Sequence, residues 1–165
     1  MEDKLWKVFL NVNKWLEYAE KKNTLILSFI GIQLTFVRLF IDKINVLQLI
    51  AMSFLGLCFL ITLISFFPKT VIPWWVYTWA QSKKEPNVND NLLFYGHITK
   101  YSVKSYIENL EKYFGETISG HKYLEDLCNQ IVVNSQITTT KYNMFKATTW
   151  LMIVGQVLLF LSFWM

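Results

Sequence analysis

The sequence predicts an all-α membrane protein on three observations. Apolar residues make up 53% of the 165 residues, and charged residues only 17%. The charges are concentrated in residues 1–23 and 69–146, which leaves long stretches nearly free of charge. No segment of the soluble part alternates polar and apolar residues as a strand would. This pattern is typical of a chain that crosses a bilayer and keeps a small water-soluble region.

Four parts are expected along the chain. Residues 1–23 form an amphipathic N-terminal helix, and residues 24–68 form a transmembrane hairpin. Residues 69–146 form a small helical region in the cytoplasm, and residues 147–165 form a third transmembrane span. A long helix begins in the cytoplasmic region and continues into this third span.

The N-terminal segment has an apolar stripe with the 3.6-residue period of a helix. The stripe consists of Leu5, Val8, Phe9, Val12, Trp15, Leu16 and Ala19. The segment lacks the short apolar run and cleavage site of a signal peptide, so we expect it to be retained. Two interpretations stay open, since the helix either lies on anionic lipid or packs on the other helices.

The hairpin consists of two apolar segments joined by a short turn. Residues 24–40 are just long enough to cross, and Arg38 near their end can extend to the headgroups. The turn at 41–45 leads into a second span over residues 44–67, which ends at Pro68. Most lysines lie within residues 1–23 and 69–146, on the side of the membrane where the hairpin begins and ends. The positive-inside rule therefore places both of these segments in the cytoplasm.

The region after the hairpin begins with an aromatic segment. Residues 71–81, VIPWWVYTWAQ, suit a collar at the membrane surface, and the alternative is a hydrophobic cluster that caps the soluble helices. Residues 82–90 predict a polar loop. Asp90 is expected to cap a short helix, and Ser102 the next one, which ends at Gly115.

The long helix is predicted from about Gly120 onward. No Pro or Gly occurs after it until Gly155, while HKYLEDLCNQIVVNSQITTTKYNMFK leads directly into ATTWLMIVGQVLLFLSFWM. At a rise of 1.5 Å per residue such a helix is roughly 65 Å long, about twice the thickness of the hydrocarbon core. Half of it stands in water, which suggests that it couples an event outside the bilayer to one inside.

Several function classes find no support in the sequence. It contains no phosphate-binding Gly loop, no HExxH and no nucleophile elbow, so an enzyme is not expected. His97 and His121 have no metal-spaced companions, and Cys58 and Cys128 are expected to be packed thiols. Zinc-finger spacing and dense Arg patches are also absent, so nucleic acid is not an expected partner. The net charge of +4 fits anionic lipid or an anionic ligand better.

Three segments together are characteristic: WLEYAEKKNTLILSFIGIQL, NLLFYGHIT followed by YIENL, and LEDLCNQIVVNSQITTTKYNMFKATTWLMIVGQVLL. These segments resemble the transmembrane effector family of the Pycsar antiphage systems. The resemblance is carried by Glu20 and Lys22 before the first span, the FYG-like residues 94–96, and the QI, NS and KY pairs within 130–142. At Glu20 the family pattern favours the shorter Asp.

The resemblance implies an effector in the bacterial inner membrane. Such an effector is switched on by a cyclic pyrimidine nucleotide, cyclic UMP or cyclic CMP, which a partner cyclase makes. It then impairs membrane integrity and halts the infected cell. Residues 69–146 would be the sensor region, with no metal or further cofactor. The alternatives are a non-enzymatic anchor or scaffold that recruits a protein partner, and a related two-span nucleotide-signalling effector.

One feature of the long helix is a candidate ligand site. The apolar positions Leu124, Leu127 and Ile131 continue at helical spacing into Asn134, Thr138 and Lys141. A cyclic nucleotide needs a cation for its phosphate, amide groups for its base and an aromatic face. Lys141 would supply the charge, Gln130 and Asn134 the amides, Thr138 a hydroxyl and Tyr142 a stacking surface. Alternatively, these groups face water, lipid headgroups or neighbouring helices.

Self-association through the spans is also expected, because three spans cannot enclose a channel alone. Small residues, which let helix backbones approach closely, recur on one face of the first span and at heptad spacing on the third. These residues are Ser28, Gly31 and Thr35, and Thr148, Gly155 and Ser162. The alternative is that the two faces pack within one chain.

Overall fold

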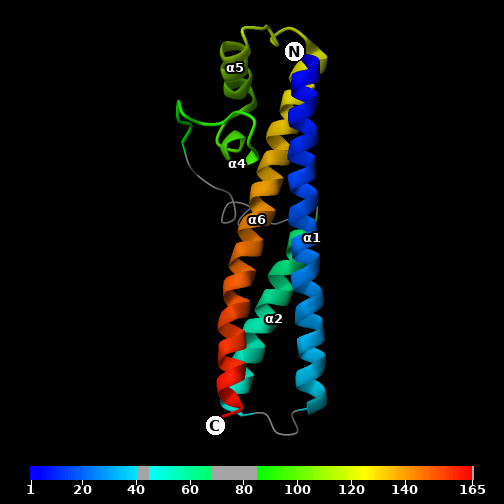
Figure 1. The fold of residues 1–165 in the computed structure, drawn as a ribbon, viewed down its shortest axis with the longest axis vertical. Helices are drawn as coiled ribbons and strands as arrows, with labels where there is room; N and C mark the ends of the chain where they lie inside the picture. Colours follow the sequence, from blue (N-terminus) through cyan, green and yellow to red (C-terminus); the bar gives the residue numbers. More distant parts are fainter. Residues whose placement is uncertain (41–44, 68–84, 165) are drawn as a thin grey trace. The chain divides into compact units, whose positions relative to one another are not determined.

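The structure is a computed structural model that describes residues 1–40, 45–67 and 85–164, with side chains of 38–40 excepted. It contains α1 (Glu2–Phe40), α2 (Val46–Phe66), α4 (Tyr95–Ile98), α5 (Val103–Phe114) and α6 (Lys122–Ser162) (Figure 1). No strand occurs in these described ranges, which confirms the all-helical prediction. The Arg38 side chain, most of the turn at 41–45, the end of the hairpin at Pro68 and the aromatic segment 71–81 lie outside the described residues.

The chain divides into two compact units, each built from segments far apart in sequence. The first unit holds Met1–Ala19 and Pro73–Lys141, and the second holds Glu20–Ile72 and Tyr142–Met165. Helices α1 and α6 therefore contribute to both units. The four-part division by membrane side stays a prediction.

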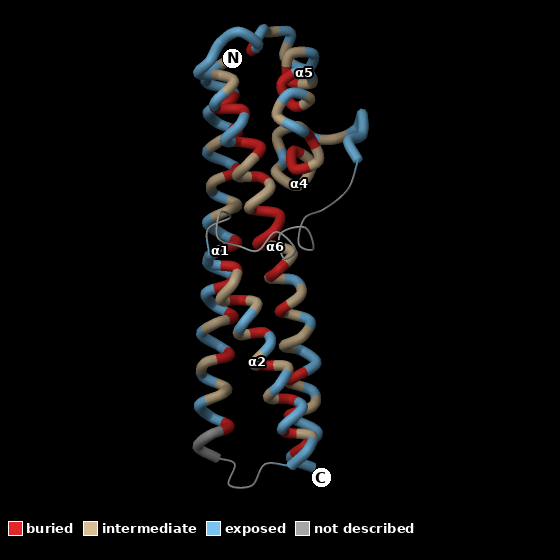
Figure 2. The backbone as a smooth tube through the Cα atoms, turned by 180° about the vertical axis from the view of Figure 1, so that it is seen from behind, coloured by how far each residue is buried: buried red, intermediate tan, exposed pale blue. Residues whose placement is uncertain are grey.

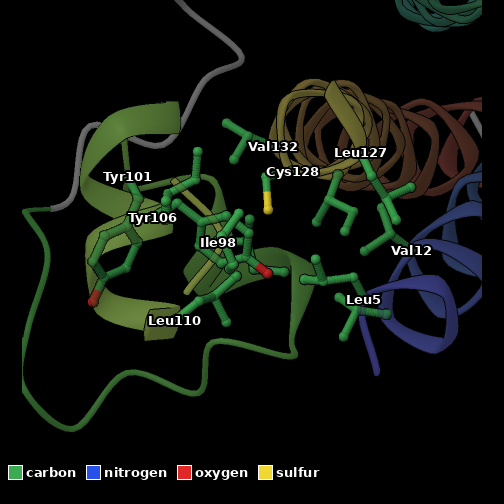
Figure 3. Packing of buried hydrophobic residues seen from close by; sticks show 13 residues of the cluster. Leu5, Val12, Ile98, Tyr101, Tyr106, Leu110, Leu127, Cys128 and Val132 are labelled. Atoms are coloured by element: carbon green, nitrogen blue, oxygen red, sulfur yellow. The ribbon is translucent and has the colours of Figure 1, made fainter. Parts of the chain in front are cut away.

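The first unit has a core made by one face of α1, one face of α6 and the short helices α4 and α5. Its buried members include Leu5, Val8 and Val12 of α1, Ile98 of α4, Tyr106, Ile107 and Leu110 of α5, and Leu127, Cys128, Ile131 and Val132 of α6 (Figure 3). The apolar stripe of the N-terminal segment is thus covered by protein. Of the two interpretations of this segment, the structure favours packing on the other helices.

The ends of α5 follow the predicted capping residues. The Ser102 hydroxyl accepts a hydrogen bond from the Ser105 amide at 3.2 Å, which satisfies one of the free N–H groups of the first turn. Gly115 ends the helix with φ of 68°, a left-handed conformation that a side chain would strain. Both predictions are confirmed.

The prediction for Asp90 is wrong. The short helix is only Tyr95–Ile98, and it begins after Phe94 without a side-chain cap. The Asp90 carboxylate instead accepts hydrogen bonds from the Asn87 amide at 2.8 Å and the Tyr101 hydroxyl at 3.2 Å, and it pairs with Lys100. A local turn contact with Asn87 and two partners that follow the short helix, Lys100 and Tyr101, therefore hold this carboxylate away from the start of α4.

In the second unit α2 packs against parts of both α1 and α6 (Figure 2). Asn45 starts α2 with a capping box, in which its side chain and that of Gln48 each accept from the other's backbone N–H. Helices α2 and α6 are long and apolar enough to cross a membrane. The stretch Thr24–Phe40 within α1 is not among the helices that meet this criterion, so its crossing stays a prediction.

The small residues of α6 face α2 within the same chain. The contacts are Cys58 Sγ donating to Thr148 O at 3.4 Å, Asn45 Nδ2 donating to Ser162 O at 3.2 Å, and Gly155, whose added Cβ would lie 3.3 Å from Phe54 Cβ. For this face the structure shows packing inside one chain. On α1, Ser28 and Thr35 are exposed and an added Cβ at Gly31 would meet no atom within 4 Å, so association through that face stays a prediction.

Candidate functional site

The predicted polar residues lie on α6 where the first unit ends. Asn134, Thr138 and Lys141 follow the buried Leu127 and Ile131 along the helix, without a break in it. Because these positions recur at helical spacing, the polar face continues the apolar face of the core. We call Gln130, Asn134, Thr138 and Lys141 the polar face of α6.

Asn134 shows what covers the polar face. Its side-chain Nδ2 donates a hydrogen bond to Asn13 Oδ1 of α1 at 2.8 Å. Asn134 is half-buried, so the bond is shielded in part from competing water. The polar face therefore meets another helix of the first unit, and the interpretation that it simply faces water does not hold here.

The next two members are buried more deeply. Thr138 is fully buried, and its hydroxyl donates to the backbone carbonyl of Asn134 at 2.7 Å. Lys141 is only 8% exposed. A partly desolvated ammonium is stabilised strongly by a nearby negative group, because fewer water molecules compete for it. Lys141 is therefore the residue of this face best suited to attract a phosphate.

The other two predicted residues lie differently. Gln130 is exposed, at the edge of the face. Tyr142 belongs to the second unit, where the Lys22 ammonium lies 5.0 Å from the centre of its ring and 5.4 Å from that of Phe145. These are cation–π distances, so Lys22 is held over two rings of α6. The stacking role of Tyr142 stays a prediction.

Sequence reasoning missed three residues near this face. Asn13 was not singled out, because it lies beside the apolar stripe of α1 and only its bond to Asn134 reveals its place. Ser135 and Thr139 are buried, and their hydroxyls have no hydrogen-bond partner among the described residues. They are one helical turn apart on α6. Their spacing as hydroxyl residues on one helix face is the sequence signal that could have identified them.

The FYG-like motif is a packing element of the first unit. A Cβ added at Gly96 would lie 2.7 Å from Phe94 Cε1, so glycine leaves room for that ring. The Tyr95 ring packs against Trp15 of α1, with centroids 5.6 Å apart. His97 Nδ1 accepts from the Asn91 amide at 2.8 Å, which fixes the imidazole. The motif thus fastens α4 onto α1.

One hollow elsewhere in the described first unit suits an anionic ligand less well. A hollow between α5 and α6 is lined by Glu108, Glu125 and Asp126 together with Lys104. Three carboxylates against one ammonium disfavour a phosphate. Across the described residues no group of three His, Cys, Asp or Glu side chains could hold a metal ion.

The comparisons with known proteins bear on the whole chain. The family model of the Pycsar effector protein domain matches residues 4–165. The chain belongs to this family. The searches of curated proteins and of solved structures gave no match.

Membership in the Pycsar effector family has direct consequences. The matched residues take in both units except for the first three residues of the chain, so both units belong to the effector domain. This Pycsar effector acts in antiphage defence, and the family implies activation by a cyclic nucleotide from a pyrimidine cyclase. Together with the apolar helices α2 and α6, the family indicates a membrane protein.

Proposed function

We propose that this effector binds a cyclic pyrimidine nucleotide at the polar face of α6 and impairs inner-membrane integrity through the helices of the second unit. The observation that carries the proposal is the continuity of α6 from Lys122 to Ser162. One helix bears both the polar face and an apolar stretch fit to cross a membrane. An uninterrupted helix transmits a displacement without a hinge.

The chemistry of the polar face supports a nucleotide ligand. The Lys141 ammonium would form a charge-assisted hydrogen bond with the phosphate. The amides of Asn134 and Gln130 offer both donors and acceptors, which suits the edge of a pyrimidine base, and Thr138 adds a hydroxyl. The partner cyclase would supply the ligand, and lipid would surround the second unit.

The bond between Asn13 and Asn134 supports a mechanism for the switch. A base that engages the Asn134 amide must compete with Asn13, which occupies that amide in this structure. A ligand shifts an equilibrium only when it prefers one state over the other. The nucleotide would therefore favour a state in which α1 and α6 of the first unit separate at this point, and α6 would pass the change on.

The test is nucleotide binding by detergent-purified protein, where no anionic headgroups compete. A panel of cyclic purine and pyrimidine mononucleotides is titrated against the wild type and Lys141→Ala. Loss of one charge-assisted contact should cost ~1.5–3 kcal/mol, which is more than tenfold in affinity. Lys146→Ala, which removes an exposed lysine from the same helix, is the matched control and should bind like the wild type.

Two results would contradict the proposal. If Lys141→Ala is folded by circular dichroism and binds like the wild type, the nucleotide lies elsewhere and Lys141 has another role, such as an anchor to lipid headgroups. If the wild type binds no cyclic nucleotide, the alternative of a scaffold that recruits a protein partner is favoured.

A further inference from the structure

Within the second unit, α1 and α6 are parallel neighbours with a definite register. The Lys22 ammonium of α1 lies 5.4 Å from the centre of the Phe145 ring of α6. Further along both helices, Val37 and Leu159 belong to one hydrophobic cluster, which also contains Ala51 of α2. Residue numbers thus rise together along the two helices, and residues at equal distances beyond Lys22 and Phe145 lie at the same depth.

This register brings two glutamines to one level. Gln33 lies about three helical turns after Lys22, so the two share one face of α1. Gln156 lies about three turns after Phe145, so these two share one face of α6. Because Lys22 and Phe145 face each other, Gln33 is directed to the α6 side of α1, and Gln156 to the α1 side of α6. Both lie within the apolar stretches expected to cross the membrane.

Each glutamine has a buried amide atom whose hydrogen bonding is incomplete. Gln33 Oε1 and Gln156 Nε2 have no hydrogen-bond partner among the residues that the structure describes. The first atom is an acceptor and the second is a donor. In hydrocarbon such groups are unfavourable, because no solvent can replace the missing bond. Gln48 of α2 differs, because its side chain completes the capping box with Asn45.

The layers on either side of the two glutamines are apolar. Ile30 and Leu34 of α1 pack in one cluster with Leu151 and Met152 of α6, and Val37 and Leu159 pack in the next. The glutamines therefore form a polar layer between these two apolar clusters. A buried water molecule typically occupies such a place when two or more polar groups converge on it.

We propose that Gln33 and Gln156 form a water-binding layer between α1 and α6 of the second unit. A water molecule there donates to Gln33 Oε1 and accepts from Gln156 Nε2. A second part of the inference rests on the proposed function. In the activated effector, the aqueous path crosses the apolar interior at this layer, since polar side chains lower the cost of admitting water at that depth.

The first test needs no nucleotide. Gln33→Cys and Gln156→Cys are reconstituted separately in vesicles and treated with a small hydrophilic thiosulfonate, which reacts with thiolates. Thr35→Cys and Val157→Cys are the matched controls, because these exposed residues lie on other faces of the same helices. The unsubstituted chain, whose Cys58 and Cys128 are buried, gives the blank.

Since thiolates form readily only where water reaches them, labelling at the two glutamine positions should be about tenfold faster or more than at the controls. Labelling as slow as at Thr35→Cys and Val157→Cys would overturn the water-binding layer. A dry layer with a direct bond between the two amides would give that slow result.

The second test addresses the aqueous path. The double variant Gln33→Leu with Gln156→Leu is compared with the wild type for release of a trapped ion-sensitive dye from vesicles on addition of cyclic UMP or cyclic CMP. It should bind nucleotide like the wild type, resist thermal unfolding at least as well, and lose most of the release. Ser53→Ala, which removes an exposed polar side chain of α2, should release dye like the wild type.

The two hypotheses fail differently. Dye release by the double variant at the wild-type rate, or its failure to fold, would overturn the role of this layer in the path. A wild type that releases no dye with any nucleotide would overturn the proposed function, while the labelling rates would still decide whether the layer binds water.

Discussion

Glu116 ties the loop after α5 to the start of α1. Its Oε1 accepts a hydrogen bond from Lys4 Nζ at 2.6 Å, and the Lys4 ammonium also lies 4.8 Å from the centre of the Phe114 ring. The hydrogen bond from Lys4, together with that from the amino group of Met1, lowers the pKa of Glu116 to about 2. The carboxylate is therefore held in its charged form by contacts that form only in the folded protein.

This shift predicts an acid-dependent loss of stability. The folded pKa is depressed, so the stabilisation is fully present above the ordinary value of 4.5 and is lost as the pH falls toward about 2. We expect the unfolding free energy in detergent to fall over this window, and to fall less steeply in Glu116→Gln. Denaturant titrations at pH values from 2 to about 7, monitored by circular dichroism, measure this free energy of unfolding. Glu108→Gln, at an exposed carboxylate of α5, should keep the wild-type slope; equal slopes for both variants would contradict the assignment.

At the scale of single residues, sequence predicted those roles that depend on local geometry. Ser102 and Gly115 act as predicted, because a cap and a left-handed C-terminus are set within a few residues. Asn13 was missed because its partner lies on a segment that only the fold brings near. Asp90 was misplaced because its carboxylate bonds the turn at Asn87 and the residues after the short helix, in place of that helix's first turn. The spacing of Asn134, Thr138 and Lys141 identified one helix face, yet could not show that α1 covers part of it.

At the scale of elements, the contact between α2 and α6 rests on close approach at Gly155. A Cβ added there would lie 3.3 Å from Phe54 Cβ and 3.5 Å from the Ala51 carbonyl oxygen, so little room exists for a side chain. Gly31 of α1 offers a contrast, since a Cβ there would meet no atom within 4 Å. The two glycines thus distinguish packing inside the chain from an open helix face.

Gly155→Leu should therefore destabilise the protein, because overpacking typically costs about 1–3 kcal/mol. Gly31→Leu should be tolerated in the monomer, since no neighbour must move. Thermal unfolding in detergent, with the oligomer mass measured by light scattering, compares the two. A drop in oligomer mass for Gly155→Leu with unchanged stability would show instead that this face joins copies of the chain. A drop confined to Gly31→Leu would place the association on α1.

The helices themselves were predictable from hydrophobic period and from the absence of Pro and Gly. The course of α6 followed from an unbroken pattern, and the apolar stripe of the first segment appears as a buried face of α1. Sequence predicts the short helix after Asp90 over LLFYGHITKY, residues 92–101, which is too long, since α4 covers only Tyr95–Ile98. Short helices depend on tertiary packing more than on local preference, so their bounds are hard to predict.

At the scale of the whole molecule, α1 and α6 each contribute to both units, so neither unit is built from one continuous stretch. The family match covers both units, which fits a single functional domain rather than a sensor attached to a separate anchor. Which unit faces the cytoplasm was predicted from lysine distribution alone. That assignment determines whether the polar face of α6 can meet a nucleotide made inside the cell.

The orientation can be tested with two thiols that the structure places well. Val46 opens α2 and is 75% exposed, and Val88 is fully exposed in the loop before α4. They are better sites than Asn45, whose side chain caps α2, or Asn87, which accepts from the Asn89 amide. If residues 69–146 are cytoplasmic, an impermeant thiol reagent should label Val46→Cys in intact spheroplasts and Val88→Cys only after permeabilisation.

The unsubstituted chain is the control for this labelling, because Cys58 and Cys128 are buried and burial raises the pKa of the Cys128 thiol to about 12. Labelling of Val88→Cys in intact spheroplasts, with Val46→Cys protected, would place the first unit outside the cell. A nucleotide from a cytoplasmic cyclase could then not reach Lys141, and the proposed function would fail at the level of topology. Labelling of both sites in intact spheroplasts would put the start of α2 and the loop before α4 on one side, which contradicts a crossing by α2.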